Sequence, residues 1–195
     1  RIHARQFGQA LVDALAGEMI AYGPEELLEL GEREFAWCEA RMLEAARELG
    51  YGEDWRAALE HVKGLHVGPG EQDELVALQA REAIAFLDER GLVTIEDLCR
   101  ETWRLDMLSA DGQRTLPFAA YGGQKMLVAY PTAGMDHERK EMSLRGNNVH
   151  FSRIVTPHEL IPGHHLQGYM AQRYATWLSA FRTPFLTEGW GRHWE

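Results

Sequence analysis

A helical pattern of hydrophobic residues in the first hundred positions is the feature that most limits the fold of this chain. Between Pro24 and Leu49, apolar residues recur at spacings of three, four or seven, with Glu and Arg between them. This spacing is typical of an amphipathic helix. Pro24 suits a first helical position and Gly50 a left-handed stop. Because the stripe covers fewer than four heptads and Gly31 interrupts it, packing against a core is favoured over a coiled coil.

Two more helices are predicted before residue 100, and the pattern then changes. One helix covers 55–65 and ends before Gly-Pro-Gly, and another carries apolar positions from Val76 to Leu87 and ends at Gly91. Short alternating or apolar runs near 103–107 and 126–130 predict two or three strands.

The expected fold is therefore mainly α with a small β-sheet, in a single domain or a fragment. A loop rich in Gly, Pro and charge is expected over 131–148. The predicted organisation is a helical part over 1–100, short strands and loops over 101–155, and further helices over 156–195.

Charge and composition exclude several classes of partner. The net charge is -10 and no run of Lys or Arg occurs, so a nucleic-acid partner is not expected. Two cysteines are too few for a disulfide framework, and no apolar run is long enough to span a membrane. The chain begins with Arg1 and stops at Glu195, so we expect a fragment truncated at both ends. The compartment is left open, with the cytoplasm preferred, and the oligomeric state is unknown.

A motif at 156–167 carries the chemistry. It reads Thr-Pro-His-Glu-Leu-Ile-Pro-Gly-His-His-Leu-Gln, which becomes the HExxH pattern of zinc peptidases when Pro162 and Gly163 are removed. HExxH places two imidazoles on one helical face beside a Glu that holds the attacking water. Pro162 cannot continue the helical hydrogen bonds and Gly163 allows unusual backbone angles. We therefore expect a bulge or kink that brings His164 beside His158.

His165 competes with His164 for the place of the second ligand. Seven residues separate it from His158, so the two share a helical face but lie about 10.5 Å apart in rise. His164 is preferred. The third ligand should be a downstream carboxylate, and Glu188 qualifies because it follows the helix-start signal Thr183-Pro184 and precedes Gly189, which leaves room for close approach. Two imidazoles and one carboxylate leave a fourth position of zinc open for water.

Each of these residues also has a purely structural explanation. Thr156-Pro157-His158-Glu159 matches a capping box at a helix start, and a Glu such as Glu188 favours a helix N-terminus. Taken together, the order and spacing of the residues favour the metal site.

The block His158 to Gln167, followed by Glu188-Gly189-Trp190, resembles a bacterial family known as domain of unknown function number 885. Its motif is HExxPGHHxQ followed by EGW. That family is mostly helical and is similar to the gluzincin metallopeptidases, in which Gly-His-Ala-Leu follows the HE pair as Gly163 to Leu166 do here. The resemblance implies a zincin-like helical catalytic region and gives a second reason to prefer His164. This chain has His193 where the family usually has Tyr.

The resemblance and the motif together predict a zinc-dependent metallopeptidase with a peptide substrate. Glu159 would act as general base and then as acid, and His193 or Tyr130 could assist at the oxyanion. The strands near 103–107 or 126–130 could offer an edge to an extended peptide. Two alternatives remain, a helical module without catalysis and a zinc hydrolase that cleaves non-peptide amides or esters.

Overall fold

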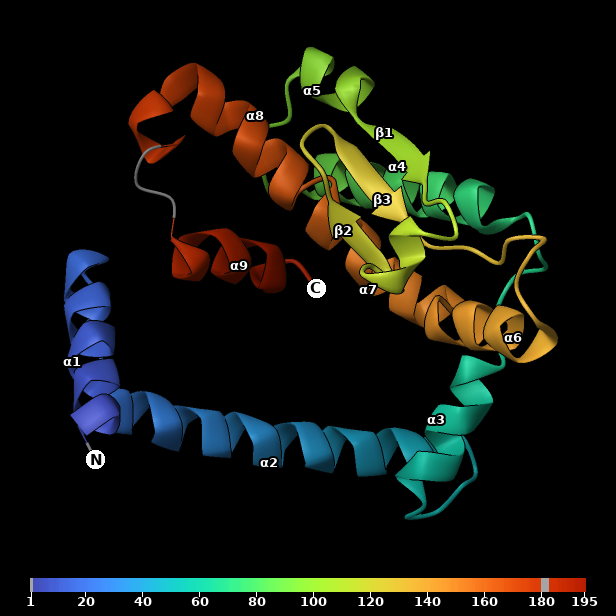
Figure 1. Ribbon diagram of the computed structural model, residues 1–195, viewed down its shortest axis with the longest axis horizontal. Helices are drawn as coiled ribbons and strands as arrows, with labels where there is room; N and C mark the ends of the chain where they lie inside the picture. Colours follow the sequence, from blue (N-terminus) through green and yellow to red (C-terminus); the bar gives the residue numbers. More distant parts are fainter. Residues whose placement is uncertain (1, 180–182) are drawn as a thin grey trace. The chain divides into compact units, whose positions relative to one another are not determined.

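Helices make up most of the chain, and one small sheet lies in its middle part (Figure 1). The computed structural model describes residues 2–179 and 183–195. Internal contacts divide the chain into two units, residues 1–61 and residues 62–195. The expected fold class, mainly α with a small sheet, is confirmed. No helix in the described ranges combines the length and apolarity that crossing a membrane requires.

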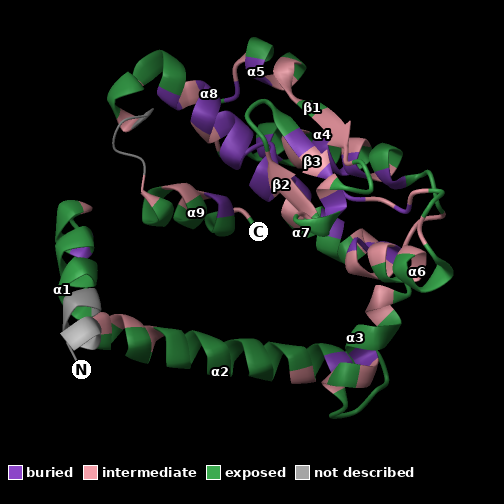
Figure 2. Cartoon of the chain, in the orientation of Figure 1, coloured by how far each residue is buried: buried purple, intermediate pink, exposed green. Residues whose placement is uncertain are grey.

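The first unit contains α1 (Ile2–Gly17), α2 (Pro24–Glu48) and most of α3 (Trp55–Lys63). The predicted ends of α2 are confirmed, since Pro24 begins it and Gly50 follows it with a φ of 84°. The predicted packing of its apolar stripe against a core is not found among the described residues of the first unit. Leu28 and Phe35 are 69% and 68% exposed, and α2 is coloured almost entirely as exposed in Figure 2.

The second unit holds the sheet and the remaining helices. Its elements are α4 (Gln72–Arg90), α5 (Asp97–Thr102), β1 (Arg104–Met107), β2 (Ala119–Tyr121), β3 (Lys125–Val128), α6 (His137–Gly146), α7 (Val149–Glu159), α8 (His164–Tyr174) and α9 (Pro184–His193), with short 3₁₀ turns at Gly112–Arg114 and Thr176–Ser179. The predicted end of α4 at Gly91 is confirmed, because Gly91 caps it in the left-handed conformation.

The sheet has the strand order β1-β3-β2. β1 pairs with β3 in parallel and β2 pairs with β3 antiparallel, so β3 is the central strand. Of the two runs expected to offer a free edge, only the one at β1 does so, because β3 is paired on both sides. The other edge belongs to β2, which the sequence patterns did not locate.

Two hydrophobic cores meet at the junction of α7 and α8. Leu160 packs with Met126 and Val128 of β3 and with Val76 and Ala80 of α4. The next residue, Ile161, packs instead with a second cluster, whose other buried members are Leu87, Ile95, Cys99, Leu166 and Tyr169. Because consecutive residues are buried in different cores, the path of the chain between the two helices is fixed from both sides.

The expected loop over 131–148 is wrong for its second half, which forms α6. The side chain of Asp136 accepts a hydrogen bond from the backbone N–H of Arg139 and so caps this helix, a start signal that the Gly- and Pro-rich surroundings obscured. The turn after α6 is tied to α4, because Gln72 and Gln79 donate to the backbone oxygens of Asn147 and Val149.

Asn148 begins the helix that leads to the motif. Its side-chain oxygen accepts from the backbone N–H groups of His150 and Phe151, and its amide donates to the backbone oxygen of Arg145. The residue is 6% exposed, so water cannot replace these hydrogen bonds. Asn148 therefore fixes the start of α7.

We predict that Asn148→Ala lowers the free energy of unfolding by about 1 to 2 kcal/mol, because the first N–H groups of α7 lose their partner. Urea denaturation measures the change. Asp136→Ala at the exposed cap of α6 is the matched control and should cost less. An equal effect of the two variants would contradict a special role for the buried cap.

Candidate metal centre

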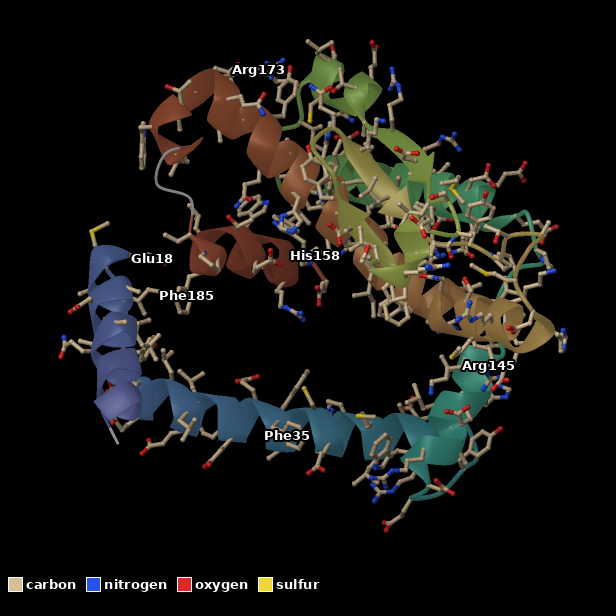
Figure 3. The ribbon with its side chains drawn as sticks, in the orientation of Figure 1. Glu18, Phe35, Arg145, His158, Arg173 and Phe185 are labelled. Atoms are coloured by element: carbon tan, nitrogen blue, oxygen red, sulfur yellow. The ribbon has the colours of Figure 1, made fainter. Side chains whose placement is uncertain are left out.

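Three side chains from three helices converge in the second unit. His158 lies at the end of α7, His164 begins α8 and Glu188 lies in α9. Nε2 of His158 is 3.5 Å from Oε2 of Glu188, and Nε2 of His164 is 3.6 Å from Oε1. One donor atom from each residue lies within 4.8 Å of the other two. Figure 3 shows His158 between α9 and the α7–α8 junction.

The break between α7 and α8 makes this arrangement possible. In a continuous helix, six residues rise about 9 Å, whereas the ring centroids of His158 and His164 are 4.6 Å apart. The predicted departure from regular helix is found, in the form of two separate helices joined by residues 160–163. Gly163 closes the junction by donating its backbone N–H to the backbone oxygen of Pro157.

Only glycine fits at position 163. A Cβ added there would lie 1.7 Å from the backbone oxygen of His158, far inside van der Waals contact. The start of α8 therefore rests directly on the last turn of α7. The same geometry rules out the capping-box interpretation, because Thr156 to Glu159 end α7 and do not begin a helix.

His165 points away from this cluster. Its Nε2 lies 3.1 Å from the backbone oxygen of Cys99 and its Nδ1 lies 3.5 Å from the hydroxyl of Tyr121. The side chain is 1% exposed, and burial lowers its pKa. Both ring nitrogens thus face protein atoms, so the structure places His164, and not His165, beside His158.

The donor set and its spacing suit zinc. Two atoms bound at 2.0 to 2.1 Å in tetrahedral geometry lie about 3.3 Å apart, close to the 3.5 and 3.6 Å between Glu188 and the two imidazoles. Glu159 and Glu195 add negative charge nearby. Two nitrogens and one carboxylate are a common protein ligand set of catalytic zinc.

Glu159 lies beside the cluster without joining it. It lines a cavity of about 370 Å³ together with the three candidate ligands, Ala120, Tyr121 and Thr187. Its carboxylate accepts a hydrogen bond from the backbone N–H of Tyr121. The residue is 9% exposed, and burial is the main cause that raises the pKa of its carboxyl, with smaller opposing contributions from His158 and from the Tyr121 N–H.

Two contacts of His158 were missed in the sequence. Nδ1 lies 2.7 Å from Oε1 of Glu195, although the ring N–H does not point squarely at that oxygen. A Cβ at Gly191 would lie 2.7 to 3.0 Å from the ring atoms. The predicted role of Gly189 in close approach is wrong, because a Cβ there would meet nothing within 4 Å. The sequence did carry a signal for these contacts, because the spacing of Glu188, Gly191 and Glu195 places them on nearly one helical face.

Tyr130 and His193, which were expected to assist at the oxyanion, are not among the described residues that line the cavity. Tyr130 follows β3 and is half-buried. His193 is exposed and its ring packs edge-on against Trp194, with 5.1 Å between centroids. Tyr121 is the tyrosine of the cavity, but its hydroxyl accepts from the backbone N–H of Gln124 and faces His165.

The fold and the site together define a mainly helical protein with a candidate metal-binding cluster of two histidines and a glutamate. A family model described as "Bacterial protein of unknown function (DUF885)" matches residues 13–195. The chain therefore belongs to this bacterial family, as its motif indicated.

A solved structure shares the fold. It is described as that of a "putative lipoprotein of unknown function from Shewanella oneidensis", with a TM-score of 0.70 and 20% sequence identity. The match covers 88% of this chain and 33% of the other, so the chain spans about a third of that protein. No curated protein sequence matches the chain. The expected similarity to gluzincins and the preference for the cytoplasm stay predictions.

We predict opposite effects for alanine at the two glycines of α9 that flank Trp190. Gly189→Ala should raise the free energy of unfolding by up to about 1 kcal/mol, because alanine is the better helix former and the position is open. Gly191→Ala should lower it, since the methyl group meets the buried His158 ring. Urea denaturation measures the free energy of unfolding of both variants. Equal stabilisation by the two substitutions would show that the contact between position 191 and the His158 ring is loose.

Proposed function

We propose that this chain is the catalytic part of a zinc-dependent peptidase. The observation that carries the proposal is the convergence of His158, His164 and Glu188 beside a buried Glu159 in one cavity. Their donor set is that of catalytic zinc sites, which keep one coordination position open. In this proposal the three residues bind zinc through two Nε2 atoms and a carboxylate oxygen.

Bound zinc would polarise the carbonyl of the scissile bond and lower the pKa of a bound water toward about 7. Glu159 then accepts the proton of the attacking water and donates it to the leaving amine. Its position supports this role, because it neighbours the ligand His158 in sequence, faces the same cavity and stays outside the ligand group. The hydrogen bond from the Tyr121 N–H fixes the direction of its carboxylate.

The strand β2 supports a peptide as the substrate. The backbone hydrogen bonds from Ala129 to Phe118 and from Gly122 to Lys125 link β2 to β3. Antiparallel strands alternate the direction of these groups, so those of Ala119 and Tyr121 point to the outer edge of β2. The N–H of Tyr121 reaches Glu159 there, and Ala120 lines the cavity. An extended peptide could therefore add to this edge and place its backbone next to the base.

Two other functions share some of these residues. A hydrolase of non-peptide amides or esters would use the same ligands and the same water, whereas a helical module without catalysis would need none of them. The edge of β2 favours a peptide over the first alternative. Metal binding combined with cleavage of peptides would exclude the second.

We predict that replacing His164 by glutamine and replacing His165 by glutamine have different consequences. His164→Gln should abolish zinc binding with little loss of stability, because the residue is a ligand. His165→Gln should retain roughly one zinc per chain but lower the free energy of unfolding by about 1 to 3 kcal/mol, since a buried hydrogen bond is disturbed. Metal analysis after dialysis and urea denaturation measure both properties. If only the His165 variant loses zinc, then His165 is the ligand and His164 is not.

We predict that Glu159→Gln retains zinc and thermal stability but loses turnover by about 100-fold or more, because an amide cannot take the proton from water. The measurement is cleavage of a mixed peptide library by the intact protein, read by mass spectrometry. Glu138→Gln is the control, since Glu138 is an exposed glutamate in α6, and its activity should match wild type. Substantial cleavage by the Glu159 variant would remove Glu159 from the mechanism.

A further inference from the structure

We propose that Glu195 is a positioning residue for His158. Its carboxylate holds one ring nitrogen of His158 so that the other ring nitrogen faces the metal position. The carboxylate lies at Nδ1, 2.7 Å from that atom, while Nε2 of the same ring faces Glu188 at 3.5 Å. The two glutamates therefore contact opposite edges of one imidazole. The role at the metal rests on the proposed function, but the orientation of the ring does not.

The chemistry of the two partners sets the tautomer. A neutral imidazole carries hydrogen on one nitrogen and a lone pair on the other. An ionised carboxylate can only accept hydrogen bonds, and Glu195 lies 2.7 Å from Nδ1 whereas Glu188 lies 3.5 Å from Nε2. The closer carboxylate, Glu195, therefore favours the tautomer with hydrogen on Nδ1. Nε2 then holds the lone pair that a metal requires, and it is directed at Glu188. A carboxylate at the second nitrogen of a ligating histidine is a common device for this purpose.

Glu195 itself is held in place from several sides. Its Oε2 lies 3.4 Å from Nη1 of Arg192, and its backbone N–H donates to the backbone oxygen of Arg192. Trp194, the preceding residue, packs against the core cluster that contains Leu166. The Glu195 side chain is 25% exposed and that of His158 is 10% exposed. The contact is therefore shielded, unlike an ion pair at the surface.

The α9 helix and the two residues that follow it constrain His158 on three sides. Glu188 faces Nε2, Gly191 packs against the ring and Glu195 contacts Nδ1. Trp190 fixes the helix by donating from Nε1 to the backbone oxygen of Pro162, at 2.6 Å. One segment thus supplies a candidate ligand and also orients a ligand from another helix. Glu195 does not serve as a fourth ligand here, because it lies on the far side of the ring from Glu188.

The test combines two readouts on the intact protein. In metal-free protein labelled with ¹⁵N-histidine, long-range ¹H–¹⁵N correlations show which ring nitrogen of His158 carries hydrogen. A His158→Gln variant assigns the signal. Zinc affinity is measured separately by competition with a fluorescent chelator. The variants are Glu195→Ala, Glu195→Gln and, as the control, Glu138→Gln.

We predict hydrogen on Nδ1 in the wild type and a shift toward the other tautomer in Glu195→Ala, with zinc affinity reduced by about 10- to 100-fold. Glu195→Gln should lie between the two, because its amide oxygen can still accept. Glu138→Gln should change affinity by less than about fivefold, since Glu138 is an exposed glutamate of α6 that does not line the cavity.

An unchanged tautomer in Glu195→Ala would overturn the proposal, as would an unchanged zinc affinity. If the wild type binds no zinc, the proposed function fails, while the tautomer measurement still decides whether Glu195 orients His158. If Glu195→Ala does not fold, the comparison of Glu195→Gln with Glu138→Gln decides the same question.

Discussion

The close contact between Gly163 and the last turn of α7 is the constraint on which the site depends. Any side chain at position 163 would occupy the space of the His158 backbone oxygen. Because Gly163 has no side chain, α8 can start where α7 ends. The imidazoles of His158 and His164 therefore meet although the two residues are six positions apart. The cores around Leu160 and Ile161 hold the junction from both sides. Local geometry and tertiary packing therefore specify the same backbone path, which is what a preorganised site requires.

Charge gives the site its chemical character. Glu188 and Glu195 flank one imidazole, Glu159 lies beside them, and the described residues that line the cavity include no lysine or arginine. Carboxylates that approach one another without cations repel, and this repulsion contributes to the raised pKa of Glu159. A divalent cation between the imidazoles and Glu188 would relieve the repulsion and leave Glu159 free to act as a base. The same arrangement thus favours a metal and a proton acceptor.

The sequence predicted local structure better than it predicted contacts across the fold. The ends of α2 and α4 follow from Pro24, Gly50 and Gly91, because capping is a local property. The motif also predicted the helix break and the residues that meet, since spacing within one segment limits their geometry. Glu195 and Gly191 escaped notice because their importance arises only when α9 packs against His158. Likewise, no local pattern distinguishes β2 as the strand that borders the cavity.

The proposed metal binding and the proposed hydrolysis are separable properties of this site. The candidate ligands, the proposed base and the proposed positioning glutamate lie between residues 158 and 195, so the proposed metal binding depends on helices that the chain itself supplies. Substrate selection is different, because the fold is shared with a protein about three times as long at 20% identity, and similarity of fold does not carry function with it. The geometry at His158 therefore supports the proposed metal centre, while the proposed selection of a substrate depends on what borders β2.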